Sequence, residues 1–241
     1  MAADDYSPIV PRARLGFIIP SSNRMVEPQI QLYVPAGVVP HFTRLRMTNR
    51  HRKPLPELLP AILDSVALLM DSKCDVIVFQ CTGTSMSGGV EADDAVVAAI
   101  RKAADRPAVS TAGAVRAALS ALGASRLIFI SETGPAGHGK KLDYLREAGY
   151  EILQERAACL AGSDAYCSTP PEFWYDTAMQ LKDPRAQACF ISCANIQSMD
   201  VIERLEQSLG VPVITSNQAA LWRALRLLGI SAPGPGMLFR H

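Results

Sequence analysis

The sequence predicts an α/β fold made of two pseudo-symmetric, doubly wound half-domains, each with a four-stranded, mainly parallel sheet. Short apolar runs rich in Val, Ile and Phe alternate with helical patterns along the chain, which is typical of βαβ units. The sequence also repeats itself: segment 14–20 resembles segment 126–132, and Cys193 follows Cys81 by the same 112 positions. We therefore expect two related halves with the active site in the cleft between them, at the carboxyl ends of their strands.

The expected strands divide evenly between an N-terminal half, residues 1–122, and a C-terminal half, residues 123–241. Each strand is a short apolar run bounded by turn-forming or small polar residues. The eight strands are 15–19, 41–47, 76–80, 108–110, 127–131, 151–157, 188–192 and 213–215.

The expected helices lie between these strands and show apolar residues at helical spacing. They are 56–72, 91–104, 113–122, 140–148, 171–181, 199–209 and 218–228. Prolines and glycines in the tail after Ser231 rule out a further long helix there. We expect this tail to pack across a domain surface, and it could return to the N-terminal half.

Composition narrows the classes of partner. The chain has 241 residues with 24 Lys and Arg against 23 Asp and Glu, so its net charge of +1 leaves no electrostatic footprint for nucleic acid. No stretch is long and apolar enough for a membrane span, and no secretory signal is recognisable, so we expect a cytoplasmic protein with reduced cysteines. No cysteine and histidine spacing predicts a metal site.

Small polar residues follow four of the expected strands, at 20–23, 81–85, 131–133 and 193–195. Backbone N–H groups and short side chains at such strand ends can bind a carboxylate without a metal or a lysine. A fifth end of this kind is 215–217. The sequence therefore favours a small anionic ligand in the cleft. For Asn23, an ordinary helix-capping role is the alternative to a substrate contact.

Two cysteines stand at equivalent strand ends. Cys81 precedes a polar turn that suits a reactive site better than a core, and a nearby helix N-terminus would stabilise its thiolate. Cys193 occupies the matching place in the second half. A buried structural cysteine is the alternative for each. The other cysteines lack this context, and we expect core positions for Cys74, Cys159 and Cys189 and an exposed loop for Cys167.

Four segments carry a family resemblance: 16–28, Cys81-Thr82, 191–195 and 209–216. With their spacing, they resemble the aspartate/glutamate racemase superfamily, in the branch that contains maleate cis-trans isomerase and arylmalonate decarboxylase. The resemblance implies an isomerase that needs no cofactor. In such isomerases one cysteine adds to the double bond of a cis-enedioate, and a second helps the elimination that follows bond rotation.

Carried over to this sequence, the resemblance makes Cys81 the nucleophile and Cys193 the acid/base. It also implies a small carboxylate substrate, and we expect a homo-oligomer, a dimer or a tetramer. The expected substrate-binding residues are Ser21, Ser22, Asn23, Thr82, Gly83, Thr133, Asp164, Ala194 and Asn195.

Two positions depart from the isomerase pattern. Thr133 stands where tyrosine is usual, and Asp164 stands where asparagine is usual. A carboxylate at position 164 would repel a dicarboxylate if it faced the cleft. Tyr166 could replace the missing phenol, as could His138, which we expect in a flexible loop.

The sequence is also compatible with three other functions. Both cysteines could serve as opposed bases in a racemase of amino acids or hydantoins. An arylmalonate-type decarboxylase is less favoured, because the resemblance gives those enzymes glycine in place of Cys81. A small-anion binding protein would keep the cleft without chemistry.

Overall fold

The computed structural model describes residues 10–47 and 53–241, and it contains two parallel sheets separated by helices. The sheets have the same topology, with strand orders β2-β1-β3-β4 and β6-β5-β7-β8, and every strand pair is parallel. The strands are β1 (Ala13–Pro20), β2 (Val38–Leu45), β3 (Val76–Phe79), β4 (Ala108–Ser110), β5 (Arg126–Ser131), β6 (Glu151–Ala157), β7 (Ala188–Ser192) and β8 (Val213–Thr215). The α/β class and the two equivalent four-stranded sheets are therefore confirmed.

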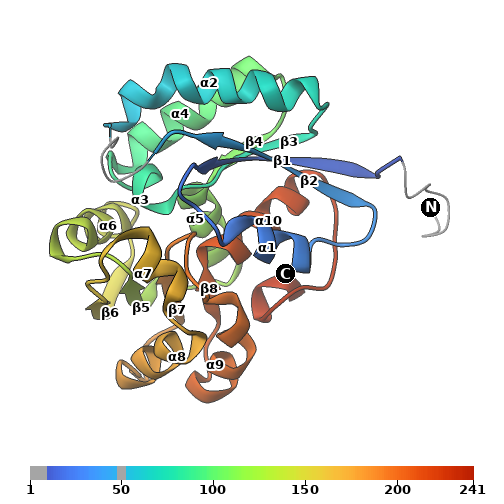
Figure 1. Cartoon of the computed structure of the whole chain (residues 1–241). Coiled ribbons are helices and arrows are strands. Elements are labelled where there is room, and N and C mark those ends of the chain that lie inside the picture. Colours follow the sequence, from blue (N-terminus) through green and yellow to red (C-terminus); the bar gives the residue numbers. More distant parts are fainter. Residues whose placement is uncertain (1–9, 48–52) are drawn as a thin grey trace.

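Helices cover both faces of each sheet (Figure 1). They are α1 (Val26–Tyr33), α2 (Leu55–Asp71), α3 (Thr82–Ser85), α4 (Gly89–Ala104), α5 (Thr111–Ala121), α6 (Pro135–Glu147), α7 (Gly162–Ser168), α8 (Pro171–Gln180), α9 (Ile202–Leu209) and α10 (Ser216–Leu227). Two 3₁₀ turns, η1 (Met199–Val201) and η2 (Met237–Arg240), complete the described elements. No described helix is long and apolar enough to pass through a bilayer.

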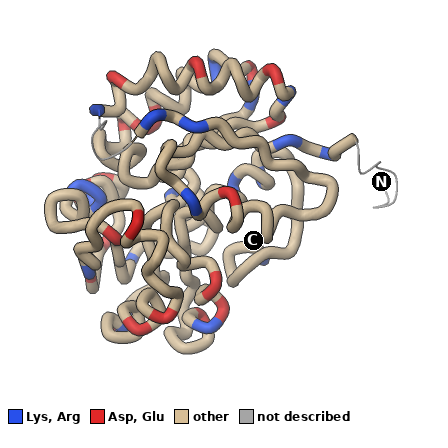
Figure 2. The backbone as a smooth tube through the Cα atoms, in the orientation of Figure 1, with Lys and Arg blue, Asp and Glu red and all other residues tan. Residues whose placement is uncertain are grey.

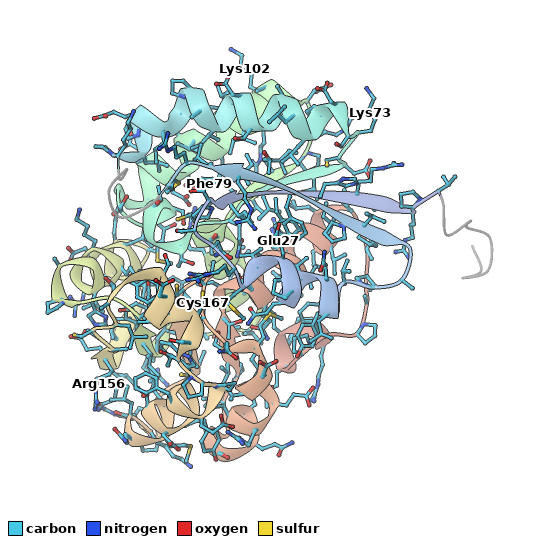
Figure 3. All side chains as sticks on the ribbon, in the orientation of Figure 1. Glu27, Lys73, Phe79, Lys102, Arg156 and Cys167 are labelled. Carbon is cyan, nitrogen blue, oxygen red and sulfur yellow. The ribbon has the colours of Figure 1, made fainter. Side chains whose placement is uncertain are left out.

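A single apolar core lies between the two sheets. Because successive side chains of a strand point to opposite faces, Phe17 and Phe129 face inward to helices such as α5 and α10, and their neighbours Ile18 and Ile128 face outward. The outward face of the first sheet packs on α2 and α4, where Figure 3 shows Phe79, and that of the second packs on α8 and α9. The boundary at residue 122, which divides this shared core, stays a prediction.

Five elements differ clearly from the sequence expectation. Strand β2 runs from Val38 to Leu45 rather than over 41–47, because it pairs in register with the whole of β1. Helix α6 begins at Pro135, a residue suited to a first helical turn, so His138 is helical and buried instead of in a flexible loop. Helices α1, α3 and α7 were not predicted, because each is short, with 8, 4 and 7 residues.

The C-terminal tail packs against β8, α9 and α10. The carboxylate of Glu206 accepts hydrogen bonds from the backbone N–H of Met237 at 2.8 Å and of Val213 at 3.0 Å. Leu238 is fully buried in the shared core. Lys and Arg residues are interspersed with Asp and Glu residues over the molecule (Figure 2), in keeping with the small net charge.

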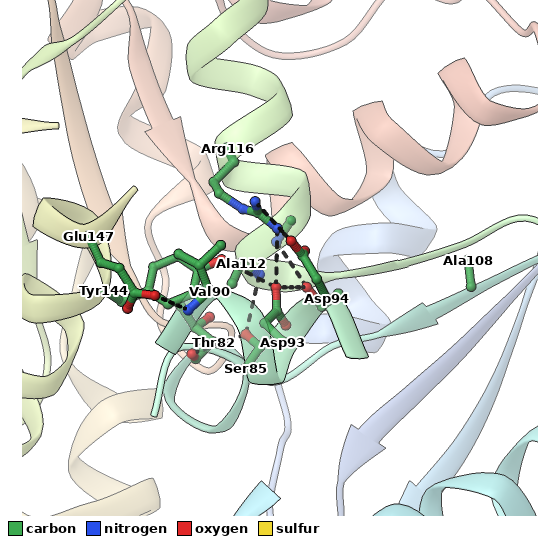
Figure 4. Close-up of polar contacts among 12 residues, drawn as sticks. Thr82, Ser85, Val90, Asp93, Asp94, Ala108, Ala112, Arg116, Tyr144 and Glu147 are labelled. Atoms are coloured by element: carbon green, nitrogen blue, oxygen red, sulfur yellow. Dashed lines mark hydrogen bonds and ion pairs between the residues drawn. The ribbon is translucent and has the colours of Figure 1, made fainter. Parts of the chain in front are cut away.

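A buried acidic cluster joins α4 of the first half to α6 of the second (Figure 4). Asp93 Oδ2 accepts hydrogen bonds from Ser110 Oγ at 2.8 Å and from Tyr144 Oη at 3.2 Å, and Arg116 lies 3.7 Å away. Asp93 Oδ1 is buried with no partner among the described residues. Burial raises the pKa of Asp93 to about 6, although Ser110 and Arg116 oppose the shift.

Asp93 should make folding stability depend on pH. Its folded pKa of about 6 exceeds the unfolded value of about 4, so the free energy of unfolding falls as pH rises from about 4 to 7. In urea denaturation, we expect the free energy of unfolding of Asp93→Asn, relative to that of the wild type, to increase by about 1 kcal/mol from pH 5 to pH 8. Asp94→Asn, at the exposed neighbouring carboxylate, is the matched control. Parallel stability curves for Asp93→Asn and the wild type would contradict this prediction.

Candidate active site

One buried side-chain amide, that of Asn217, joins the two cysteine-bearing segments. Its Nδ2 donates to the carbonyl oxygen of Ala194 at 3.1 Å, and its Oδ1 accepts from Gln80 Nε2 at 2.8 Å. Gln80 directly precedes Cys81, and Ala194 directly follows Cys193. The amide therefore fixes how the carboxyl ends of β3 and β7 stand relative to each other.

The hydroxyl of Ser216 makes a second link between the same segments. Its Oγ accepts from Thr82 Oγ1 at 2.8 Å and from the backbone N–H of Cys193 at 3.1 Å. Thr82 and Ser216 are both buried. The predicted contact of Thr82 with substrate stays a prediction, and its hydroxyl already has this protein partner.

Cys81 is partly exposed and occupies the N-cap position of the short helix α3. Burial raises the pKa of its thiol, and a side-chain and a backbone hydrogen bond from Thr84 oppose that shift, as does the charge of Lys141. Cys81 Sγ lies 3.1 Å from Thr84 Oγ1. Because α3 has only four residues, Thr84 rather than a long helix dipole stabilises the thiolate.

Cys193 is 7% exposed and has an unusual backbone. Its φ of 136° lies in a region that favours glycine, so this residue stores strain of the kind that clusters at functional sites. Its Sγ accepts from the backbone N–H of Asn195 at 3.3 Å. Burial raises the pKa of Cys193 well above its usual value, and the nearby carboxylate of Glu132 raises it further.

The two thiols therefore have different acidities although they occupy equivalent strand ends. Burial raises the pKa of both thiols, and the next largest contribution is a lowering by Thr84 at Cys81 but a raising by Glu132 at Cys193. A thiolate at Cys81 would also raise the pKa of Cys193. Cys81 is the thiol that ionises more readily.

Asn23 lies at the junction of the two sheets. Its Nδ2 donates to Ala194 O at 3.0 Å, and its Oδ1 accepts from the backbone N–H groups of Met25 and Val26 at 3.0 and 2.9 Å. The capping alternative is thus present in the structure. Because an amide nitrogen carries two hydrogens, one N–H of Asn23 remains for a ligand within the described part of the chain.

The serines after β1 lie beside the end of β2. Ser21 Oγ accepts from Met47 N at 3.3 Å, and Ser22 Oγ donates to Met47 O at the same distance. Ser163, which the sequence did not single out, contacts Ser22 Oγ at 3.2 Å. Gly83 is exposed, and nothing lies within 4 Å of the position of an added Cβ. Substrate contacts of these residues stay predictions.

Asn195 links the segment after β7 to the segment after β1 and to helix α7. Its Oδ1 accepts from the backbone N–H of Arg24 at 2.8 Å and from Cys167 Sγ at 3.2 Å. Cys167 lies on α7 next to the junction of the two sheets (Figure 3), and it is only partly exposed. Cys74 and Cys189 are buried as predicted, but Cys159 is exposed and not part of the core, because it falls after the end of β6.

Asp164 lies at the surface. Its side chain is 94% exposed and pairs with Arg24 Nη2 at 2.6 Å. The sequence led us to expect that the Asp164 carboxylate would repel a second carboxylate of the substrate. Solvent and the Arg24 guanidinium screen this repulsion. A contact between Asp164 and substrate stays a prediction.

Tyr166 lies near the place where the isomerase pattern puts a phenol. Burial raises its pKa, the charges of Glu132 and Cys193 raise it further, and Thr133 partly opposes this shift. His138, the other candidate, stacks on Phe129 with ring centroids 5.1 Å apart, and its Nδ1 lies 2.7 Å from Ser131 Oγ. Tyr166 is thus the phenol beside Cys193.

A buried ion pair beside the thiols was missed from the sequence. Lys141 Nζ lies 2.5 Å from Glu132 Oε2. Glu132 follows β5 directly, but Lys141 sits in a helix whose pattern suggests solvent-exposed lysines. Within residues 10–47 and 53–241, no three His, Cys, Asp or Glu side chains are grouped to hold a metal.

Comparison with known proteins gives the family. The arylmalonate decarboxylase family model matches residues 15–239. The chain belongs to this family. A maleate isomerase of Nocardia farcinica is 28% identical over 95% of this chain and 96% of its own length. An arylmalonate decarboxylase of Bordetella bronchiseptica is 26% identical over 76% of this chain and 78% of its own.

Solved structures agree with this assignment. The N. farcinica maleate cis-trans isomerase bound to TRIS is 26% identical, with a TM-score of 0.87 over 95% of this chain and 98% of that one. An arylmalonate decarboxylase structure at 22% identity superposes with a TM-score of 0.79 and shares the fold. The resemblance read from the sequence is therefore confirmed.

The strained backbone at Cys193 should be visible in stability. Glycine accepts a φ of 136° without strain, so we expect Cys193→Gly to be about 1 kcal/mol more stable than Cys193→Ala in urea denaturation. Cys81 provides the matched control, since its φ of −148° is ordinary and Cys81→Gly should be less stable than Cys81→Ala. If the glycine variant were less stable than the alanine variant at both positions, the backbone of Cys193 would not be strained.

The difference between the thiols should also appear in their alkylation. We expect iodoacetamide to label Cys81 at lower pH than Cys193, with each site resolved by peptide mass spectrometry. Thr84→Val removes the side-chain hydrogen bond to Cys81, so it should slow labelling at pH 7.5 by about threefold. Thr177→Val, in α8, is the control. Unchanged labelling of Cys81 in Thr84→Val would exclude this role for Thr84.

Proposed function

We propose that this chain is an isomerase that converts a small cis-enedioate of the maleate type into its trans isomer without a cofactor. The thiolate of Cys81 adds to one carbon of the double bond and forms a carbon–sulfur bond. The π electrons move to the neighbouring carbon, which takes a proton from the Cys193 thiol. The intermediate is a succinyl thioether with a carbon–carbon single bond.

Rotation about that single bond precedes the second half of the reaction. The Cys193 thiolate removes a proton from the same carbon, the double bond forms in the trans arrangement, and the carbon–sulfur bond breaks to release the Cys81 thiolate. No net oxidation or reduction occurs. Each thiol ends in the state in which it began, so the cycle needs no co-reactant.

The observation that carries this proposal is the pair of unlike thiols at equivalent strand ends. Cys81 ionises more readily, as a nucleophile should, whereas Cys193 holds its proton, as an acid should. A relative supports the same chemistry: the N. farcinica isomerase, 26% identical, has been solved with a covalently bound succinylcysteine intermediate in a cysteine-to-serine variant.

The three alternative functions predict different experimental results. A two-base racemase exchanges the α-hydrogen of an amino acid with solvent, which addition, rotation and elimination on an enedioate do not require. A decarboxylase of the arylmalonate type needs only one thiol, so Cys81 would be dispensable. Residual binding without turnover in the wild type would instead favour an anion-binding protein.

Cys81→Ser should lower maleate turnover by at least about a hundredfold, because an alcohol is a far weaker nucleophile than a thiol at neutral pH. The measurement is ¹H NMR of maleate and fumarate in deuterated buffer. Cys159→Ser, at an exposed cysteine, is the control and should keep full activity. An active Cys81→Ser enzyme would contradict the nucleophile. Release of CO₂ from an arylmalonate, or exchange of an amino-acid α-hydrogen, would replace the proposed reaction.

A further inference from the structure

The ion pair of Lys141 and Glu132 is unusually well buried for charged residues. The two side chains are 3% and 9% exposed, and the pair spans the end of β5 and helix α6. Removing two such charges from water costs several kcal/mol per ion, and a pair of matching apolar residues is often equally stable. Packing alone therefore gives no reason for a lysine and a glutamate at these positions.

The pair also leaves hydrogen-bonding capacity unused. An ammonium group carries three N–H donors, and among the described residues only Glu132 accepts from Lys141 Nζ. Buried donors without acceptors are costly, so they normally find a partner in the protein, in water or in a ligand. A carboxylate accepts such hydrogen bonds well, and charge makes them stronger.

The ion pair lies near the residues that carry out the proposed reaction. The charges of Lys141 and Glu132 act on the thiols of both Cys81 and Cys193, and on the phenol of Tyr166. Ser131 pairs with Ser192 at the ends of β5 and β7, so Glu132 and Cys193 are the next residues after two adjacent strands. Lys141 Nζ, 2.5 Å from Glu132 Oε2, therefore lies at the same strand ends as Cys193. The strand-end amides and hydroxyls predicted from the sequence are neutral, so Lys141 supplies a positive charge that they lack.

We propose that Lys141 binds a carboxylate of the substrate and that Glu132 positions its ammonium group. The proposal rests on the proposed function for the identity of the substrate, a small dicarboxylate. Glu132 fixes the position of the ammonium group, and the N–H donors that it leaves unused are available to a ligand carboxylate. Lys141 is then a specificity-determining residue, because it favours a carboxylate over a neutral group at this end of the substrate.

The test measures binding of succinate, which has both carboxylates of the substrate but no double bond to react. In the double variant Glu132→Gln/Lys141→Met both charges are removed together, so no buried charge is left unpaired. We expect its melting temperature to stay close to that of the wild type. Its Kd for succinate by calorimetry should rise at least tenfold, and so should its KM for maleate.

Two further variants separate binding from structure. The swapped pair Glu132→Lys/Lys141→Glu keeps an ion pair but moves the ammonium group off α6, and we expect it to bind succinate as weakly as the double variant. Arg146→Met removes an exposed cation on the same helix, where it pairs with Glu155, and should bind like the wild type.

Each outcome bears on one of the two proposals. Wild-type succinate affinity in the folded double variant, or in the swapped pair, would overturn the role of Lys141. A shift of the iodoacetamide pH profile without a change in succinate affinity would do the same, because the pair would then act on the thiols alone. Absence of succinate binding by the wild type would also overturn it. Tight succinate binding that depends on Lys141, without maleate turnover, would reject only the isomerase.

Discussion

The arrangement of the two thiols depends on the buried amide of Asn217. All of its hydrogen-bonding groups are used: besides Gln80 and Ala194, its Nδ2 donates to Gln29 Oε1 at 2.6 Å. Two donors and one acceptor are required at the same place, and a carboxylate could not supply the donors. Since its partners come from both sheets, this one side chain couples the relative position of the sheets to the separation of the cysteines.

The duplicated fold supplies two equivalent strand ends, and the local environments make them chemically different. Cys81 has ordinary extended backbone and contacts Thr84, whereas Cys193 has a positive φ, deeper burial and the carboxylate of Glu132 nearby. Burial and neighbouring charge are the factors that separate the acidities of similar groups in active sites. A symmetric scaffold can therefore carry one nucleophile and one acid with the same functional group.

Most of the fold follows from local sequence patterns, because buried parallel strands are short apolar runs and each is followed by a helix. Strand ends are also visible, so the cysteines and Asn23 could be named in advance. Sequence patterns do not predict helix limits that depend on tertiary contacts. Helix α1 begins at Val26, whose backbone N–H donates to Asn23 Oδ1, and α6 includes His138 because Pro135 begins its first turn.

Burial of charge is the other property that the sequence conceals. Lys141 belongs to a polar helical segment and could equally well be exposed, and only the fold shows that α6 turns it toward Glu132. The reverse holds for Asp164, which a family pattern places near the substrate and which lies at the surface with Arg24. A periodicity reports which face of a helix is apolar, but not which charged residue a neighbouring strand end will cover.

The features that break local rules gather at the thiols. A cysteine with positive φ and a buried ion pair each cost stability, and both lie at the carboxyl ends of strands whose other residues are packed regularly. The shared core between the sheets offsets these costs, since Phe17, Phe129 and Phe190 are fully buried there. Departures from local preference that persist in an otherwise consistent fold are the expected mark of a functional site. Their position beside Cys81 and Cys193 therefore supports the same conclusion as the acidity of the thiols.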